Sequence, residues 1–96
     1  MPKTSATTME FENSLANFPN PFNPTTSISF SIKEASHVNI KVFDLIGQQV
    51  AELVNEEKEA GSYSVSFDAS HLPSGVYIYT IHSASFIQTR KMLLMK

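Results

Sequence analysis

Five side chains in this sequence could perform acid–base chemistry: His37, His71, His82, Asp44 and Asp68. Histidine titrates near neutral pH and often acts as a general base in enzymes. No local pattern prepares these groups for catalysis, because the sequence has no Gly-x-Ser-x-Gly turn, His-Glu-x-x-His helix or phosphate-binding loop. The three histidines fall at the start of an expected strand, in an expected turn and near a strand end, so we expect them at the surface. The sequence therefore predicts a protein that is not an enzyme.

Carboxylates are the other groups that could bind a ligand, since calcium prefers oxygen donors on loops. Asp44, Asp68 and the run Glu56-Glu57-Lys58-Glu59 supply such oxygens, but their spacing does not resemble an EF-hand. There is no cysteine to hold zinc or form a disulfide. We interpret the acidic run as a solvated loop and predict no metal and no cofactor.

Composition limits what the chain can be. Its 96 residues are enough for one domain, and 42 % of them are apolar, including seven Phe, which fits a compact fold. The net charge of −2 offers no basic stripe for nucleic acid. Residues 1–10 lack the features of a signal peptide, and the apolar run 92–95 is too short to cross a bilayer. Charge is uneven, however: residues 51–60 are acidic, whereas residues 69–96 contain bases and no acid.

The elements that would position these groups have a period of two. Apolar residues alternate with serine in 27–32 and in 63–67, and they alternate with polar residues in 37–43, which is typical of half-buried strands. Segment 76–82 is apolar enough to be a central strand packed on both faces. Segments 49–54 and 86–95 complete the expected strands; in 49–54 the spacing of Val50 and Leu53 also suits a helix, but its neighbours favour a strand. Residues 56–60 are expected to form a charged loop.

Three prolines fall within residues 18–24, a stretch that can be neither a helix nor a central strand because proline has no N–H to donate. We expect a kinked edge segment here, with Phe18 and Phe22 reaching the core. Together the patterns predict an all-β fold, an immunoglobulin-like antiparallel β-sandwich of about seven strands. Residues 1–16 are interpreted as a disordered linker or added leader, and residues 17–96 as the domain.

Three stretches in this order resemble the C-terminal sorting domain family of the type IX secretion system, also called the Por secretion tail, type A. They read Asn17-Phe18-Pro19-Asn20-Pro21-Phe22-Asn23-Pro24-Thr25-Thr26, then Val38-Asn39-Ile40-Lys41-Val42-Phe43-Asp44-Leu45-Ile46-Gly47-Gln48-Gln49-Val50, then Leu72-Pro73-Ser74-Gly75-Val76-Tyr77 with a chain ending Lys91-Met92-Leu93-Leu94-Met95-Lys96. Each motif alone is weak evidence, but their combination and spacing are specific. The resemblance covers residue 17 to the end of the chain.

The resemblance implies a tail that carries a fused N-terminal cargo domain out of the cell. The expected partners are an outer-membrane translocon and a sortase-like peptidase, and the expected route is through the periplasm to the cell surface. Cleavage is expected within residues 10–18. The motif and recognition candidates are Pro19, Asn20, Pro21, Phe22, Gly47, Pro73, Gly75, Tyr77, Arg90, Lys91, Met92, Leu93, Leu94 and Lys96.

Several of these residues also have simpler interpretations. The prolines can serve only to protect a sheet edge against aggregation, which we favour over direct contact for Pro19 and Pro21. Residues 92–95 can close the core, offer an open strand edge to a partner, or do both. Such an edge could also support a dimer. The alternative function is that of an adhesion, spacer or carbohydrate-binding module, for which Tyr63, Tyr77 and Tyr79 would have to form an exposed aromatic face.

Overall fold

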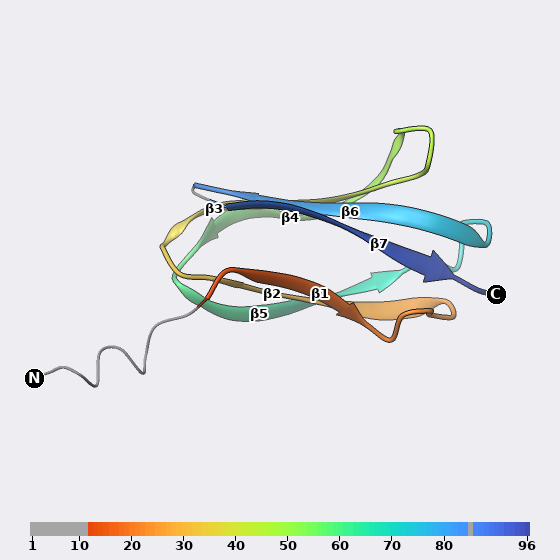
Figure 1. The fold of residues 1–96 in the computed structure, drawn as a ribbon, viewed down its shortest axis with the longest axis horizontal. Helices are drawn as coiled ribbons and strands as arrows, with labels where there is room; N and C mark the ends of the chain where they lie inside the picture. Colours follow the sequence, from red (N-terminus) through yellow and green to blue (C-terminus); the bar gives the residue numbers. More distant parts are fainter. Residues whose placement is uncertain (1–11, 85) are drawn as a thin grey trace, which may run out of the picture.

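The computed structural model describes residues 12–84 and 86–96, which form seven strands in two antiparallel sheets packed face to face (Figure 1). One sheet has the order β1-β2-β5 and the other the order β4-β3-β6-β7. This confirms the prediction of an immunoglobulin-like β-sandwich with about seven strands. The bounds are β1 Ser14–Phe18, β2 Thr25–Ile32, β3 Ser36–Phe43, β4 Gln49–Lys58, β5 Gly61–Asp68, β6 Gly75–Ser83 and β7 Phe86–Leu94. None of the described residues belongs to a helix that is long and apolar enough to cross a membrane.

The core lies between the sheets and follows the predicted alternation. In β2, β3 and β6 the residues that point inward are buried, and the residues between them are more exposed, as the period of two requires. The inner positions are Ile28, Phe30 and Ile32 on β2, Val38, Ile40 and Val42 on β3, Tyr77, Tyr79 and Ile81 on β6, and Met92 and Leu94 on β7. The core thus joins every part of the chain from β1 to β7.

The expected leader overlaps the first strand of the sandwich. Residues 1–11 lie outside the described part of the chain, but Ser14 to Ala16 pair with β2 in register from Ser14↔Ser31 to Ala16↔Ser29. Leu15 is only 1 % exposed, so this strand contributes to the core. The boundary expected after residue 16 is therefore too late. One apolar residue in a five-residue strand gives no periodic signal, which is why the pattern did not show it.

Strand β4 is longer than predicted. It continues to Lys58 and includes most of the segment that was expected to be a charged loop. Its ambiguous apolar spacing has a structural cause. Two register shifts occur in its pairing with β3, where Val42↔Ala51 is followed by Phe43↔Gln49 and Ile40↔Val54 by Lys41↔Glu52. Val50 and Leu53 are the extra residues at these bulges. Each bulge changes the apolar spacing from two residues to three, which imitates a helix.

Strand β6 is central as predicted, with β3 and β7 hydrogen-bonded on either side. Its inner face is buried, but Val76, Ile78 and Thr80 on the outer face are half-buried and His82 is exposed. The prediction that β6 packs on both faces is therefore correct for its inner face and only partly correct for its outer face. Apolar side chains on the outer face cover one another across strands, as Val76 does opposite Leu93, and no second layer covers them within the described residues.

Candidate recognition end of the sandwich

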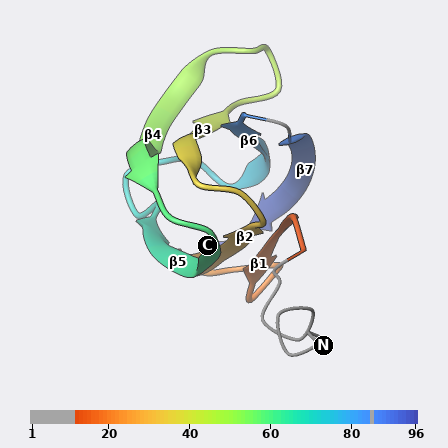
Figure 2. The same ribbon diagram turned by 90° about the vertical axis from the view of Figure 1, so that its left-hand side faces the viewer.

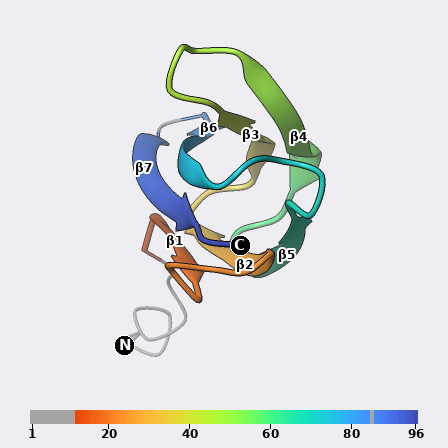
Figure 3. The same ribbon diagram turned by 90° about the vertical axis from the view of Figure 1, so that its right-hand side faces the viewer.

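One end of the sandwich gathers all three sequence motifs. Strand pairing places the β1–β2 loop, the β3–β4 turn, the β5–β6 loop and the residues after β7 at this end, which also carries the C-terminus in Figure 1. We call it the motif end. Figure 3 looks onto it, whereas Figure 2 looks onto the opposite end, which carries the β2–β3, β4–β5 and β6–β7 turns. Motif residues as far apart in sequence as Asn20 and Leu93, which are 73 positions apart, are thus close in space because antiparallel strands return the chain to the same end.

The proline segment binds the outer edge of β7. Phe22 forms a parallel bridge with Leu94, in which the Phe22 N–H donates to the carbonyl of Leu93 at 2.9 Å and the Met95 N–H donates to the carbonyl of Phe22 at 2.9 Å. The side chain of Asn20 extends this pairing. Its amide Nδ2 donates to the Lys91 carbonyl at 3.3 Å, and its Oδ1 accepts from the Leu93 N–H at 3.0 Å. Asn20 therefore acts as one more strand residue, and we call this set of contacts the clamp.

Phe22 also contributes to the core, and only this one of the two expected phenylalanines does so. Phe22 is 2 % exposed, and its ring centroid lies 6.2 Å from that of Phe67, whereas Phe18 is 81 % exposed. The expectation that Phe18 reaches the core is wrong. Phe18 pairs with Ser27 at the last position of β1, where the alternation set by buried Leu15 directs it away from the other sheet.

The prolines themselves lie at the surface, and their carbonyls shape the loop. Pro19 and Pro21 are exposed. The Pro19 carbonyl accepts a hydrogen bond from the buried Thr26 hydroxyl at 2.8 Å, and the Asn17 amide donates to both Pro19 and Thr26. The loop is therefore held by side chains on each side of the prolines, in the form that presents Asn20 and Phe22 to β7.

The end of the chain is held by the β5–β6 loop as well. The Lys96 N–H donates to Ser74 Oγ at 3.0 Å, and Lys96 Nζ donates to the Ser70 carbonyl at 2.7 Å. The loop has its own supports, since the Tyr77 hydroxyl donates to the Pro73 carbonyl at 2.6 Å and the Asp68 carboxylate accepts from the Ser70 N–H at 2.9 Å. Ser70 and Ser74 were not among the sequence candidates, because serine in a turn rarely marks a specific contact.

Two of these groups have shifted pKa values. The hydrogen bonds that Ser70 donates lower the pKa of the Asp68 carboxyl below its ordinary value, because they favour the charged form. Burial raises the pKa of the Tyr77 hydroxyl above that of free tyrosine. The Asp68 carboxyl therefore favours its charged form and accepts from the Ser70 N–H. The Tyr77 hydroxyl favours its neutral form and donates to the Pro73 carbonyl.

Gly47 lies in the tight turn between β3 and β4. Its N–H donates to the Asp44 carbonyl, and the Asp44 carboxylate accepts from the N–H groups of Ile46 and Gln48. The φ angle of Gly47 is 93°, a left-handed conformation that side chains with a Cβ rarely adopt. The backbone of this turn therefore favours glycine at this position. The turn exposes Leu45 and Ile46 to solvent.

The candidates on β7 divide between its two faces. Met92 and Leu94 point into the core and are at most 2 % exposed, whereas Lys91 is exposed and Leu93 half-buried on the outer face. Arg90 is exposed on the inner side, where it lines a shallow depression between β1 and β7 together with Asn17 and Tyr79. Burial raises the pKa of Tyr79, and the nearby Arg90 charge partly opposes this shift.

The outer edge of β7 is only partly open. Strand β7 is the last strand of its sheet, as expected, but the clamp already occupies its main chain from Lys91 to Met95. The expectation of an open edge is therefore wrong for this half. For Phe86–Arg90, β6 is the one hydrogen-bonded strand in the described part of the chain.

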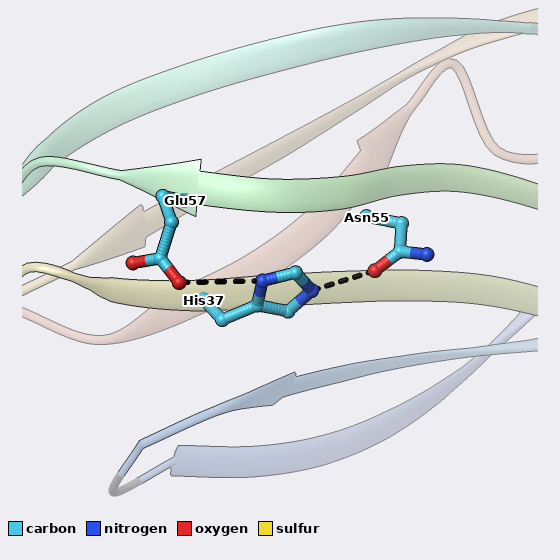
Figure 4. Close-up of polar contacts among 3 residues, drawn as sticks. All are labelled: His37, Asn55 and Glu57. Carbon is cyan, nitrogen blue, oxygen red and sulfur yellow. Dashed lines mark hydrogen bonds and ion pairs between the residues drawn. The ribbon is translucent and has the colours of Figure 1, made fainter.

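The acid–base candidates do not assemble into a catalytic site. Figure 4 shows His37 between the side chains of Asn55 and Glu57, with Nε2 at 2.6 Å from Asn55 Oδ1 and Nδ1 at 3.4 Å from Glu57 Oε2. Both ring nitrogens face exposed side chains of β4, and the His37 side chain is itself 52 % exposed. His71 and His82 are exposed at other places. Among residues 12–84 and 86–96, no three His, Asp or Glu side chains are grouped as metal ligands would be.

Fold and site together define a class: an immunoglobulin-like β-sandwich whose motif residues join the start of the domain to its last strand. The family comparison agrees with this arrangement, because the model of the secretion system C-terminal sorting domain (Por_Secre_tail) matches residues 16–95. The chain belongs to this family, and it is a sorting domain of the type IX secretion system. A search of curated proteins finds no match to the chain. The family is one of sorting signals and not of catalysts, and it implies an upstream cargo and export toward the cell surface.

Proposed function

We propose that this domain carries its cargo through the outer membrane by presenting the motif end to the type IX translocon, and that a sortase-like peptidase then removes it as the cargo is attached to the surface. The observation that supports this function is the match of the family over residues 16–95, combined with the gathering of its motifs at one end. Exposed Pro19, Pro21, Pro73 and Lys91 lie at this end. Phe22 and Tyr77 support this end from the core, and Asn20 binds it to β7.

Strand β1 restricts where cleavage can occur. A peptidase needs an extended segment that is free of other pairing, and Ser14–Phe18 are paired with β2. We therefore narrow the proposed cleavage region from residues 10–18 to residues 10–13. Cleavage there would release the sandwich intact.

The carbohydrate-binding alternative is not supported by the aromatic residues that it would need. Tyr77 and Tyr79 are at most 4 % exposed. Tyr63 stacks on Phe30 at 5.3 Å and has Lys58 Nζ 4.7 Å above its ring. These three tyrosines form no shared exposed face on which a sugar could stack.

The test is an export assay in a host that has type IX secretion, with a fluorescent cargo directed to the periplasm and residues 1–96 fused behind it. Deletion of 91–96 is a poor variant, because it removes Met92 and Leu94 from the core. We compare instead Lys91→Glu at the motif end with Lys33→Glu at the opposite end, two exposed lysines with the same change of charge. Surface cargo for the wild type and for Lys33→Glu, with cargo retained in the periplasm for Lys91→Glu, supports sorting by the motif end.

Two results would contradict the proposal. Periplasmic retention of the wild-type fusion argues against the sorting function in that host. Equal export of the two lysine variants leaves sorting intact but contradicts a role of Lys91 at the motif end.

A further inference from the structure

The outer edge of β7 has two halves that differ in how they are protected. The register with β6 is continuous from Gly75↔Leu94 to Ser83↔Phe86, so the direction of the main-chain groups alternates without interruption. The clamp uses the carbonyls of Lys91 and Leu93 and the N–H groups of Leu93 and Met95, so odd-numbered residues direct these groups outward. Ile87 and Thr89 follow the same alternation. Their N–H and C=O groups therefore point away from β6, at the half that the clamp does not reach.

Two of the three other edge strands, β4 and β1, carry features that discourage pairing, whereas the third, β5, is regular and uncharged from Gly61 to Phe67 but has no basic residue. Strand β4 has two bulges and a row of acidic side chains, and β1 is five residues long and ends at Pro19. Residues Phe86–Thr89 contain no charge, no proline and no bulge, and the Ile87 side chain is 68 % exposed. A flat, uncharged edge of this kind is what a partner strand adds to.

Charge indicates which strand would fit. Arg90 follows the open half and lines the depression between β1 and β7 with Asn17, Tyr79 and Lys91. No acidic residue occurs in β1 or from residue 69 to the end of the chain, so the described neighbours leave this positive charge uncompensated. A strand with an acidic side chain beside Arg90 would supply both the main-chain hydrogen bonds and the opposite charge.

We infer that the edge from Phe86 to Arg90 receives an extended, acidic strand of a protein partner in the export machinery, in line with the Asn20–Phe22 segment that closes the other half. This inference rests on the proposed sorting function and names the site at which the domain would be bound. Two main-chain hydrogen bonds of ordinary strength correspond to about tenfold in affinity.

Thr89→Pro tests the edge, because it removes an outward N–H that β6 does not use, and proline is tolerated in edge strands on the solvent side. Thr89→Val is the matched control, since it keeps both the N–H and the branched side chain. Arg90→Glu tests the charge without changing the main chain. In the export assay with the full-length fusion, we expect Thr89→Pro, which removes one hydrogen bond of ordinary strength, to lower surface cargo about fivefold, Arg90→Glu to lower it as well, and Thr89→Val to leave it unchanged. Thermal unfolding shows whether Thr89→Pro is folded, and if it is not, Arg90→Glu decides.

The outcomes separate this inference from the sorting function. If the wild type is exported and both Arg90→Glu and a folded Thr89→Pro are exported equally well, the edge site is wrong while sorting stands. If the wild type is not exported, sorting itself fails. A concentration-dependent dimer in sedimentation that Thr89→Pro abolishes would also overturn the inference, because the edge would then bind a second copy of the domain.

Discussion

The four-stranded sheet has two edge strands, β4 and β7, which solve the problem of exposed main-chain groups in different ways. Strand β4 protects itself locally, with bulges at Val50 and Leu53 and charged side chains between Glu52 and Lys58. Strand β7 has an uninterrupted register and depends on a segment some 70 residues earlier in the chain, Asn20–Phe22, to cover half of its edge. A distant motif is therefore needed where a strand cannot protect its own edge without losing its core residues.

This dependence gives the first motif, Asn17–Thr26, a structural role. Met92 and Leu94 must face the core, so β7 cannot carry a bulge near them without turning one of these side chains away. The clamp covers the edge without disturbing the strand. It also joins the β1–β2 loop to the last strand of the domain.

The largest expected effect that tests this comparison is the loss of Phe22. Phe22→Ala leaves a cavity next to Phe67 and removes the apolar anchor of the clamp, so we expect a loss of about 3–5 kcal/mol in the free energy of unfolding. Phe18→Ala, at the end of β1 just before this loop, is the matched control, and it should change stability by less than about 0.5 kcal/mol because Phe18 is exposed. Chemical denaturation of both variants measures the difference. Similar losses for the two would show that the segment does not use Phe22 as its anchor.

How far the sequence could predict this clamp depends on the kind of signal each residue leaves. Alternation located the strands of the core, because a buried face imposes a period of two, and the turn at Gly47 was readable because its backbone needs glycine. Asn20 was a candidate only through the family resemblance, because nothing in its local sequence shows that its amide pairs with Leu93. Long-range pairing is set by the packed fold and leaves no local pattern.

The errors have the same origin. Leu15 is a single buried residue in a short strand, and β4 hides its strand character because bulges change its period. Phe18 and Phe22 look equivalent in the sequence. The alternation of β1 directs Phe18 outward, whereas the parallel bridge to Leu94 holds Phe22 against the core. Sequence reasoning finds elements with a regular period and misses the contacts that depend on register between distant segments.

A smaller effect is expected from Asn20, whose side chain makes two hydrogen bonds to β7 at an exposed site. Asn20→Ala should lower the free energy of unfolding by about 1–2 kcal/mol, since ordinary hydrogen bonds contribute about 0.5–1.5 kcal/mol each. Asn23→Ala, three residues along in the same loop and also exposed, is the control, and we expect little change. Hydrogen exchange locates the effect: the Leu93 amide should exchange faster in Asn20→Ala, while amides of β4 should not change. Unaltered exchange at Leu93 would mean that Asn20 does not close this edge.

The smallest effect is expected at β4, whose protection depends on no single side chain. Glu57→Gln removes the ion pair with His37, which joins two side chains that are 52 % and 80 % exposed. Exposed pairs contribute little because water and salt screen them, so the free energy of unfolding should change by less than about 0.5 kcal/mol, and adding salt should not enlarge the change. Chemical denaturation at low and high salt provides the measurement. A loss as large as that of Asn20→Ala would show that β4 also depends on a specific side-chain contact, and the contrast between the two edges would then no longer hold.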